Sequence, residues 1–353
     1  MPPMSRARRD SIVVGVIALV VRIPAFFAPQ PLGFDDGQFA ASVLAMRNGG
    51  LPFTQVFSSQ GPLFLPIVWL GDLLTFRTID SPRAASVIAG VALAVLALHI
   101  GRRLTTPGAA QFGAVLVALS GSVLWTTGPL TSDGIGEALT AATVLSALVY
   151  WTRPSTRRAI AIGILAGAAL AVKSLLVIPG LAAAGFWILL RRRGRDLAII
   201  PLVGVATLLA ASVPWGLGRV YDQYVRYHTD AVADRPIAAN ASKLARTLFE
   251  RDAPLVVATL IVALAVGAAW FARRRSPNPA ASDPADPQAN PASAPAFPVA
   301  VWLVATIGVV LTESPMWRNH VAHVAVPLAI LVAVGAGATK RLVPVAAACA
   351  ILI

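Results

Sequence analysis

Two adjacent carboxylates, Asp35 and Asp36, stand out in a chain that is poor in acids. They lie in the stretch Gly33-Phe34-Asp35-Asp36-Gly37, just after the first long apolar run, and the 353 residues hold 16 Asp and Glu in all. Two carboxylates in one site of low dielectric push each other's pKa apart, as acid–base chemistry requires. The pair predicts a general base whose neighbour orients it or binds a metal. The alternative is a helix N-cap.

Asp133, Glu137 and Lys173 are further charged residues beside apolar runs. Asp133 starts a run that follows residues 129–132, and Glu137 lies one helical turn later. An acidic side chain at the start of a membrane span costs free energy, which favours a functional role for Asp133. A helix N-cap is again the alternative. Lys173 ends a run rich in Gly and Ala, where a lysine commonly snorkels to the interface. On the outer side, near two acids, it suits a lipid phosphate instead.

Arg318, His320 and His323 open a late apolar run. The two histidines are three residues apart on one helical face, which allows a metal pair, but packing at the interface is the simpler alternative. The sequence holds no Gly-rich nucleotide loop, no Cys/His zinc pattern and no nucleophile elbow. Chemistry on a soluble nucleotide therefore has no support.

Composition places these residues in a membrane protein. The chain is 57% hydrophobic and 13% charged, with a mean hydropathy of +0.73, so the bilayer is its expected solvent. A net charge of +13 could indicate nucleic acid, but the arginines cluster in short groups between apolar runs, which is the pattern of cytoplasmic loops. A single cysteine, Cys349, excludes an internal disulfide framework.

Apolar runs of span length predict an all-α polytopic protein with about eleven transmembrane helices. The first, Ser11 to Phe27, follows a basic segment and is expected to be an uncleaved anchor with a cytoplasmic N-terminus. The others are expected at Ala84–Ile100, Gly108–Thr127, Ile135–Trp151, Arg157–Val172, Leu175–Leu190, Leu197–Leu217, Ala253–Phe271, Phe297–Leu311, Val321–Ala338 and from Leu342 onward.

The run Pro62–Phe76 decides the side of every later loop. If it does not cross, all the later basic groups between spans share the cytoplasmic side with the N-terminus, as the positive-inside rule demands. We therefore expect a juxtamembrane or re-entrant helix there, after a short helix at 36–48 that Gly49-Gly50 ends. The polar candidates then face the outside of the plasma membrane.

The whole chain, 1–353, is expected to be one membrane-embedded domain. Its parts are an outer catalytic loop at 29–83, a second outer loop at 218–252 and a disordered cytoplasmic linker at 273–296. The chain stops inside an apolar run, which predicts a continuation past Ile353. Basic residues of the second outer loop suit anionic headgroups or a phosphate-bearing donor, or are simply solvated.

These features together resemble the GT-C superfamily of membrane glycosyltransferases. The nearest branch is that of protein O-mannosyltransferases and lipid A aminoarabinose transferases, the glycosyltransferase family 39 type. The resemblance rests on the acid pair after the first span, the helix opened by Pro62, Asp133 in the next outer loop and the run ending in Lys173. It implies transfer of a sugar from a polyprenyl-phosphate carrier to a glycan, lipid or protein acceptor at the outer face.

The resemblance also implies roles for single residues. Asp35, Asp36 and Asp133 match the family's acids, with Asp35 as the base of an inverting transfer. Lys173 and, more loosely, Arg318 match contacts to the donor phosphate. The residues expected to contact the acceptor or a metal are Gln60, Glu137, His320 and His323.

One departure concerns the metal. Where relatives commonly read Lys-Pro-Pro or His-Pro-Pro, this chain reads Gln60-Gly61-Pro62, which removes a charge or a metal ligand. No cofactor is therefore assigned, and a divalent metal stays open. The alternative function is a transporter or lipid flippase, which should show internal repeats and charges in mid-span. No clear repeat is visible, and the charges lie at the outer ends of the runs.

Overall fold

The computed structural model describes residues 5–24, 33–191, 194–230, 237–275 and 294–339. Apart from an isolated bridge between Pro52 and Val56, these residues form no strand, so the all-α prediction is confirmed for them. Their helices are α1 (Arg6–Val20), α3 (Phe34–Arg47), α4 (Phe64–Leu73), α5 (Ala84–Leu104), α6 (Pro107–Leu119), α7 (Gly121–Thr127), α8 (Ser132–Thr152), α9 (Thr156–Leu170), α10 (Ile178–Leu190), α11 (Gly194–Ser212), α12 (Leu217–Val220), α13 (Tyr227–Asp230), α14 (Ile237–Arg251), α15 (Ala253–Arg275), α16 (Phe297–Thr312) and α17 (Val321–Ala338).

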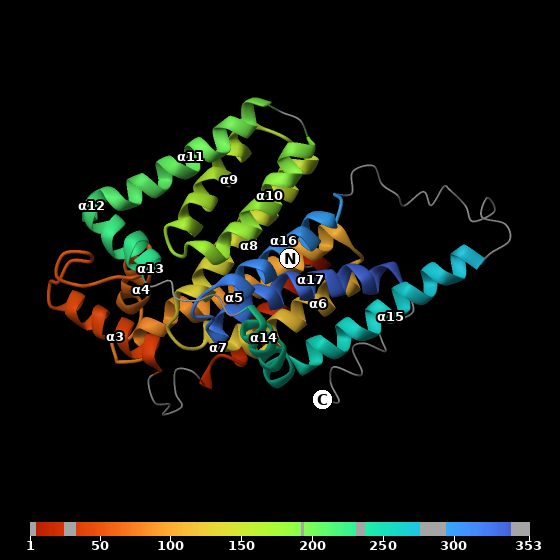
Figure 1. The fold of residues 1–353 in the computed structure, drawn as a ribbon, viewed down its shortest axis with the longest axis horizontal. Coiled ribbons are helices and arrows are strands. Elements are labelled where there is room, and N and C mark those ends of the chain that lie inside the picture. Colours follow the sequence, from red (N-terminus) through yellow and green to blue (C-terminus); the bar gives the residue numbers. More distant parts are fainter. Residues whose placement is uncertain (1–4, 25–32, 192–193, 231–236, 276–293, 340–353) are drawn as a thin grey trace.

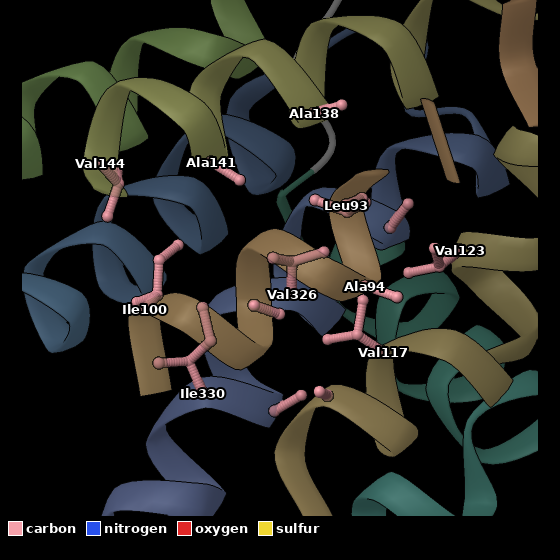
Figure 2. Close-up of a cluster of buried hydrophobic side chains, with 14 of the residues drawn as sticks. Leu93, Ala94, Ile100, Val117, Val123, Ala138, Ala141, Val144, Val326 and Ile330 are labelled. Atoms are coloured by element: carbon pink, nitrogen blue, oxygen red, sulfur yellow. The ribbon is translucent and has the colours of Figure 1, made fainter. Parts of the chain in front are cut away.

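The centre of the molecule is a bundle in which α5 contacts α6, α8 and α17 (Figure 1). Figure 2 shows its core, where Leu93 of α5, Val117 of α6 and Val326 of α17 converge, all almost fully buried. Small residues let the backbones approach closely. A β-carbon on Gly113 of α6 would lie 2.7 Å from that of Ala333 in α17. The helices α9, α10 and α11 form a second group beside this bundle (Figure 1).

Five of the described helical segments are long and apolar enough to cross a membrane. They are Ser81–Leu104, Ser132–Thr152, Gly194–Trp215, Ala253–Phe271 and Arg318–Ala338, and a bent pair at 107–127 makes up to six. The other expected spans within the described residues are helices of fewer than 18 residues. About eleven crossings, and the placing of α3 and α4 outside the membrane, therefore stay predictions.

Helix ends that the predicted topology places on the same side of the membrane contact one another. Arg102 at the end of α5 pairs with Asp10 at the start of α1 and donates to the carbonyl of Ala7. Arg191 after α10 lies 4.3 Å above the ring of Trp151, near the end of α8. These basic ends lie away from the end of α8 that carries Asp133. The side of the membrane that each end faces stays a prediction.

The run expected as one span at Gly108–Thr127 is broken. Ser120 has a non-helical backbone (φ −54°, ψ 122°), and α6 and α7 meet there at 57°. Two charged side chains satisfy the broken ends, since a helix C-terminus favours a cation and an N-terminus an anion. Arg22 donates to the carbonyl of Ala118. Asp252 accepts from the hydroxyls of Ser120 and Ser122.

The first residues of the linker expected at 273–296 are helical. Helix α15 continues to Arg275, and residues 276–293 lie outside the described residues. The expected last span from Leu342 and Cys349 also lie outside them. Whether the segment 276–293 is disordered stays a prediction.

The loop between α1 and α5 is fixed at several points. Helix α3 confirms the helix predicted at 36–48 but runs from Phe34 to Arg47, and Gly49, just after its C-cap, has a φ of +88°, which favours glycine. Its Phe39 packs edge-to-face on Phe64 of α4 at 4.7 Å. Helix α4 has ten residues, about 15 Å of rise, half the thickness of the hydrocarbon core. It therefore does not span by itself.

The segment after α3 reaches the end of α9 through backbone hydrogen bonds. The N–H of Gly61 donates to Val172 O at 3.1 Å, and that of Leu63 donates to Ala171 O at 2.8 Å. A β-carbon on Gly61 would overlap the carbonyl of Ala171. This contact places Gln60 near Lys173.

We expect Gly61→Ala to lower the free energy of unfolding by about 1–3 kcal/mol, because the added methyl group must push two backbones apart. Thermal unfolding of the purified protein measures the effect. The control is Gly108→Ala, where a β-carbon meets no atom within 4 Å. Equal unfolding temperatures for the two variants would show that the segments are not packed as closely as described.

A candidate active-site cavity

A cavity of about 790 Å³ lies where the loops at one end of the bundle meet. Cavities of this size suit small-molecule substrates. Of the predicted site residues, its wall contains Asp35, Asp36, Gln60, Asp133, Lys173 and His320. Glu137, His323 and Arg318 are not part of the wall.

The first turn of α3 presents Asp35 to the cavity. The N-cap of α3 is Gly33, so neither acid caps the helix, and the N-cap alternative is wrong for both. Asp133 does not cap either, since the N-cap of α8 is Thr131. Acids in a first turn are still favoured by the helix dipole.

Asp35 is half-buried and has no basic partner among the residues that the structure describes. Its Oδ2 lies 3.5 Å from Nδ2 of Asn319, the outer limit of a hydrogen bond. Burial and the negative charge of Asp133 raise the pKa of Asp35, and Lys173 only partly opposes them. A carboxylate with a raised pKa and a free side toward a cavity is a stronger base than an ordinary one.

Asp36 differs, because both of its oxygens are occupied. Arg83 donates from Nε to Oδ1 at 3.1 Å and from Nη2 to Oδ2, and the N–H of Leu130 donates to Oδ1 at 2.9 Å. Arg83 also pairs with Asp80 at 2.6 Å. The carboxylate joins α3 to the start of α5 and to the segment before α8. This geometry favours a structural role for Asp36 in place of the catalytic role expected from the sequence.

Four ionisable groups form a buried chain that leads from the cavity into the bundle. Nζ of Lys173 lies 3.0 Å from Oδ1 of Asp133, which also lies 3.2 Å from Nε2 of His323. Nδ1 of His323 lies 2.5 Å from Oε2 of Glu137. Each acid faces a basic group, as buried ionisable groups require. Glu137 and His323 therefore act on the cavity through Asp133.

Lys173 lines the cavity, and a glycine of α8 makes room for it. A β-carbon on Gly136 of α8 would lie 2.9 Å from that of Lys173. Burial opposes the charge of the ammonium group, but Asp133 and Glu313 outweigh it and raise the pKa of Lys173. The side chain is therefore a lasting positive charge at the cavity.

Gln60 links the first loop to the start of α8. Its Oε1 accepts from the hydroxyl of Ser132 at 2.7 Å, and its Nε2 lies 3.4 Å from the hydroxyl of Ser59. The position that the family resemblance gives to a cation is here a neutral hydrogen-bonding group. It can orient a polar substrate without adding charge.

The segment 313–320 forms another part of the wall. Nδ1 of His320 lies 2.6 Å from Oε2 of Glu313. Helix α14 holds the segment in place, because Asn240 donates to the carbonyl of Glu313 at 2.8 Å and Lys243 to that of Met316 at 2.6 Å. Helix α14 thus positions cavity residues.

Arg318 does not join the site. Its side chain is partly exposed and pairs with Glu250 at 3.1 Å, outside the cavity wall. The expected contact with the donor phosphate is not supported by this geometry. The neighbours Trp317 and Asn319 line the cavity instead, because the short 3₁₀ helix Arg318–His320 turns successive side chains in different directions.

The histidines do not form a metal pair. His320 contacts Glu313, whereas His323 lies between Asp133 and Glu137. Within the described ranges, no three His, Cys, Asp or Glu side chains are grouped so as to hold a metal ion. The use of a divalent metal stays open.

Several cavity residues were not predicted from the sequence. The aromatic ones are Phe34, Trp125, Tyr224, Tyr227 and Trp317, and the charged ones include Arg22 and Arg83. Both arginines lie at helix ends on the side expected to be outside, against the charge bias of the other loops. Arginines on that side depart from the positive-inside pattern, and this departure could have marked both as candidate site residues.

Comparison with known proteins gives two kinds of match. Residues 59–217 match the family model described as dolichyl-phosphate-mannose-protein mannosyltransferase. A sequence comparison with curated proteins found no match. Solved structures with a similar fold come from bacteria and an archaeon.

ArnT from Cupriavidus metallidurans, bound to undecaprenyl phosphate, is 17% identical, with a TM-score of 0.66 over 97% of this chain and 62% of that one. The Archaeoglobus fulgidus oligosaccharyltransferase is 12% identical, with a TM-score of 0.58 over 94% and 50%. The arabinosyltransferase EmbB from Mycobacterium smegmatis is 16% identical, with a TM-score of 0.57 over 94% and 30%. The chain spans less than two thirds of the length of each.

Proposed function

We propose that this chain, which has the GT-C glycosyltransferase fold and matches the mannosyltransferase family model over residues 59–217, is a membrane glycosyltransferase. It transfers a glycosyl group from a polyprenyl-phosphate-linked donor to an acceptor hydroxyl at the outer face of the plasma membrane. The acceptor is a glycan, a lipid or a protein. The observation that carries the proposal is one cavity with two groups of opposite charge: the half-buried carboxylate of Asp35, which has no basic partner among the described residues, and the largely buried ammonium group of Lys173.

The structural neighbours support a lipid-linked donor. The ArnT structure contains undecaprenyl phosphate, and the match covers 97% of this chain and 62% of ArnT. A lipid donor needs no nucleotide pocket, and the sequence contains no nucleotide loop. A site at the end of a helical bundle can receive a phosphate headgroup while the lipid tail stays in the bilayer.

The proposed reaction is a displacement at the anomeric carbon. Asp35 takes the proton of the acceptor hydroxyl, whose oxygen bonds to the anomeric carbon while the bond from that carbon to the phosphate oxygen breaks. The phosphate leaves with both electrons of that bond, next to Lys173, and the configuration inverts. General-base action and charge stabilisation of the leaving group are the two contributions of the protein.

A transfer assay tests the proposal. Membranes with the wild type or with Asp35→Asn, at matched amounts of folded protein, receive radiolabelled polyprenyl-phosphate sugars. We expect label to move to an acceptor with the wild type alone. Movement of intact labelled lipid across the membrane, with no sugar transfer, would favour the flippase alternative instead.

We expect Lys173→Gln to weaken binding of undecaprenyl phosphate by about tenfold or more, because a charge-assisted contact to the phosphate is lost. Fluorescence titration of the purified protein measures the dissociation constant. The control is Arg226→Gln, which removes an exposed outer-loop charge outside the cavity wall. An unchanged constant for Lys173→Gln would rule out its contact with the donor phosphate.

A further inference from the structure

Arg22 is a buried arginine in the cavity wall that the proposed reaction does not use. It follows α1 and is 1% exposed. Its Nε donates to the hydroxyl of Thr127 at 2.8 Å, and its Nη1 to the carbonyls of Ala18 at 2.8 Å and Ala118 at 3.3 Å. Its Nη2 is buried and has no hydrogen-bond partner among the residues that the structure describes.

The guanidinium group of Arg22 has no opposite charge beside it. All its acceptors are neutral, and no carboxylate of the described residues lies within 4.0 Å. Arg83, the other buried arginine of these residues, pairs with Asp36 and Asp80. Burying a charge without a counter-ion is costly, so a retained one points to an anion that arrives with a ligand.

The surrounding helices leave space for this group. A β-carbon on Gly90 of α5 would overlap Nε of Arg22 and lie 2.6 Å from Cβ of Thr127. The guanidinium group therefore lies between α5 and α7, whereas Lys173 packs on Gly136 and Asp133 of α8. The two cations belong to different walls of one cavity.

We propose that Arg22 forms a second anion subsite, which takes a phosphate or carboxylate group of a substrate in this cavity. An oxygen of that group accepts a hydrogen bond from Nη2 and supplies the missing negative charge. The inference rests on the proposed function, because it assigns the subsite to a substrate of that transfer. The anion belongs either to the polyprenyl-phosphate donor or to an acidic acceptor.

Titration of the purified full chain with inorganic phosphate tests the subsite. The proteins are the wild type, Arg22→Gln, Lys173→Gln and the double variant. We expect Lys173→Gln to retain phosphate binding and the double variant to bind about tenfold more weakly or worse, since a charged donor is lost. Equal binding by Lys173→Gln and the double variant would overturn the proposal.

Two further ligands separate the sources of the anion. If Arg22 holds the donor, Arg22→Gln should bind undecaprenyl phosphate about tenfold more weakly than the wild type. If it holds an acceptor, undecaprenyl phosphate binding should be unchanged, and a sugar phosphate such as glucose 6-phosphate should bind more weakly. Unchanged binding of all three ligands would overturn the proposal.

A purely structural role makes a different prediction. Thr127→Val removes the acceptor of Nε but keeps the charge. If Arg22 only supports the break between α6 and α7, Thr127→Val and Arg22→Gln should both lower stability without changing phosphate binding. If Arg22→Gln does not fold, phosphate binding by Lys173→Gln becomes the test. Complete loss of phosphate binding in Lys173→Gln would overturn the subsite. Arg22-dependent binding in a protein without any transferase activity would keep the subsite and reject the proposed function.

Discussion

Replacing Asp35 by Asn is expected to lower the rate of sugar transfer by about 10²–10⁴-fold, the range that general-base catalysis contributes. Asn keeps the size of the side chain but cannot accept the proton of the acceptor hydroxyl. The measurement is the initial rate of label transfer at matched amounts of folded protein. The control is Asp222→Asn, which removes an exposed carboxylate of the outer loop.

The stability of Asp35→Asn should not fall. Burial raises the pKa of Asp35 above its value in the unfolded chain, so the stability that this group contributes is present below the unfolded pKa and is lost as the pH rises through the folded pKa. At pH 7 the ionised side chain therefore costs free energy, and a neutral amide removes that cost. We expect an unfolding temperature equal to or above that of the wild type.

The raised pKa of Asp35 also determines the acid limb of the pH–rate profile. The rate should rise as Asp35 loses its proton, at a pH above the ordinary range of an aspartate. Transfer by Asp35→Asn at the wild-type rate, with the same acid limb, would exclude Asp35 as the base.

Replacing Asp36 should lower stability much more than activity, whereas replacing Asp35 should lower activity and not stability. Asp36→Asn is expected to lower the free energy of unfolding by about 3–5 kcal/mol, because it leaves the buried Arg83 without its main counter-ion. Thermal unfolding measures this loss. Activity per folded molecule should fall much less than for Asp35→Asn, since Asp36 does not take the proton.

A double variant isolates the cause. Asp36→Leu with Arg83→Met removes both charges together and should recover much of the stability that either single change loses. Additive losses in the double variant would show that the ion pair is not the reason. A stable Asp36→Asn would contradict the structural role given to Asp36.

The sequence predicted the parts of the fold that depend on local pattern. The expected runs within the described residues are helical, although the run at 108–127 is divided into α6 and α7. The short helix α3 ends before Gly49, where glycine accepts a positive φ. The GT-C fold and the convergence of Asp35, Asp133 and Lys173 also followed from the order of motifs along the chain. Their contribution to transfer stays a prediction.

Contacts between distant segments could not be predicted in the same way. The break at Ser120 depends on Arg22 and Asp252, which are remote in sequence and satisfy the exposed helix ends. The partner of Asp36 lies 47 residues away. Arg318 was expected in the site, but one position in a tight helical turn decides which side chain faces the cavity.

The buried chain from Lys173 to Glu137 also fixes the axial position of α17 against α8. Much of the bundle surface is formed by small apolar residues, which provide few distinct positions along a helix axis. His323 contacts Asp133 and Glu137, one turn apart on α8, and so fits a single position. A shift by one turn, about 5.4 Å, would separate these charges inside the bundle. The ionisable chain therefore determines helix register as well as the charge at the cavity, as a single buried polar residue does in a coiled coil.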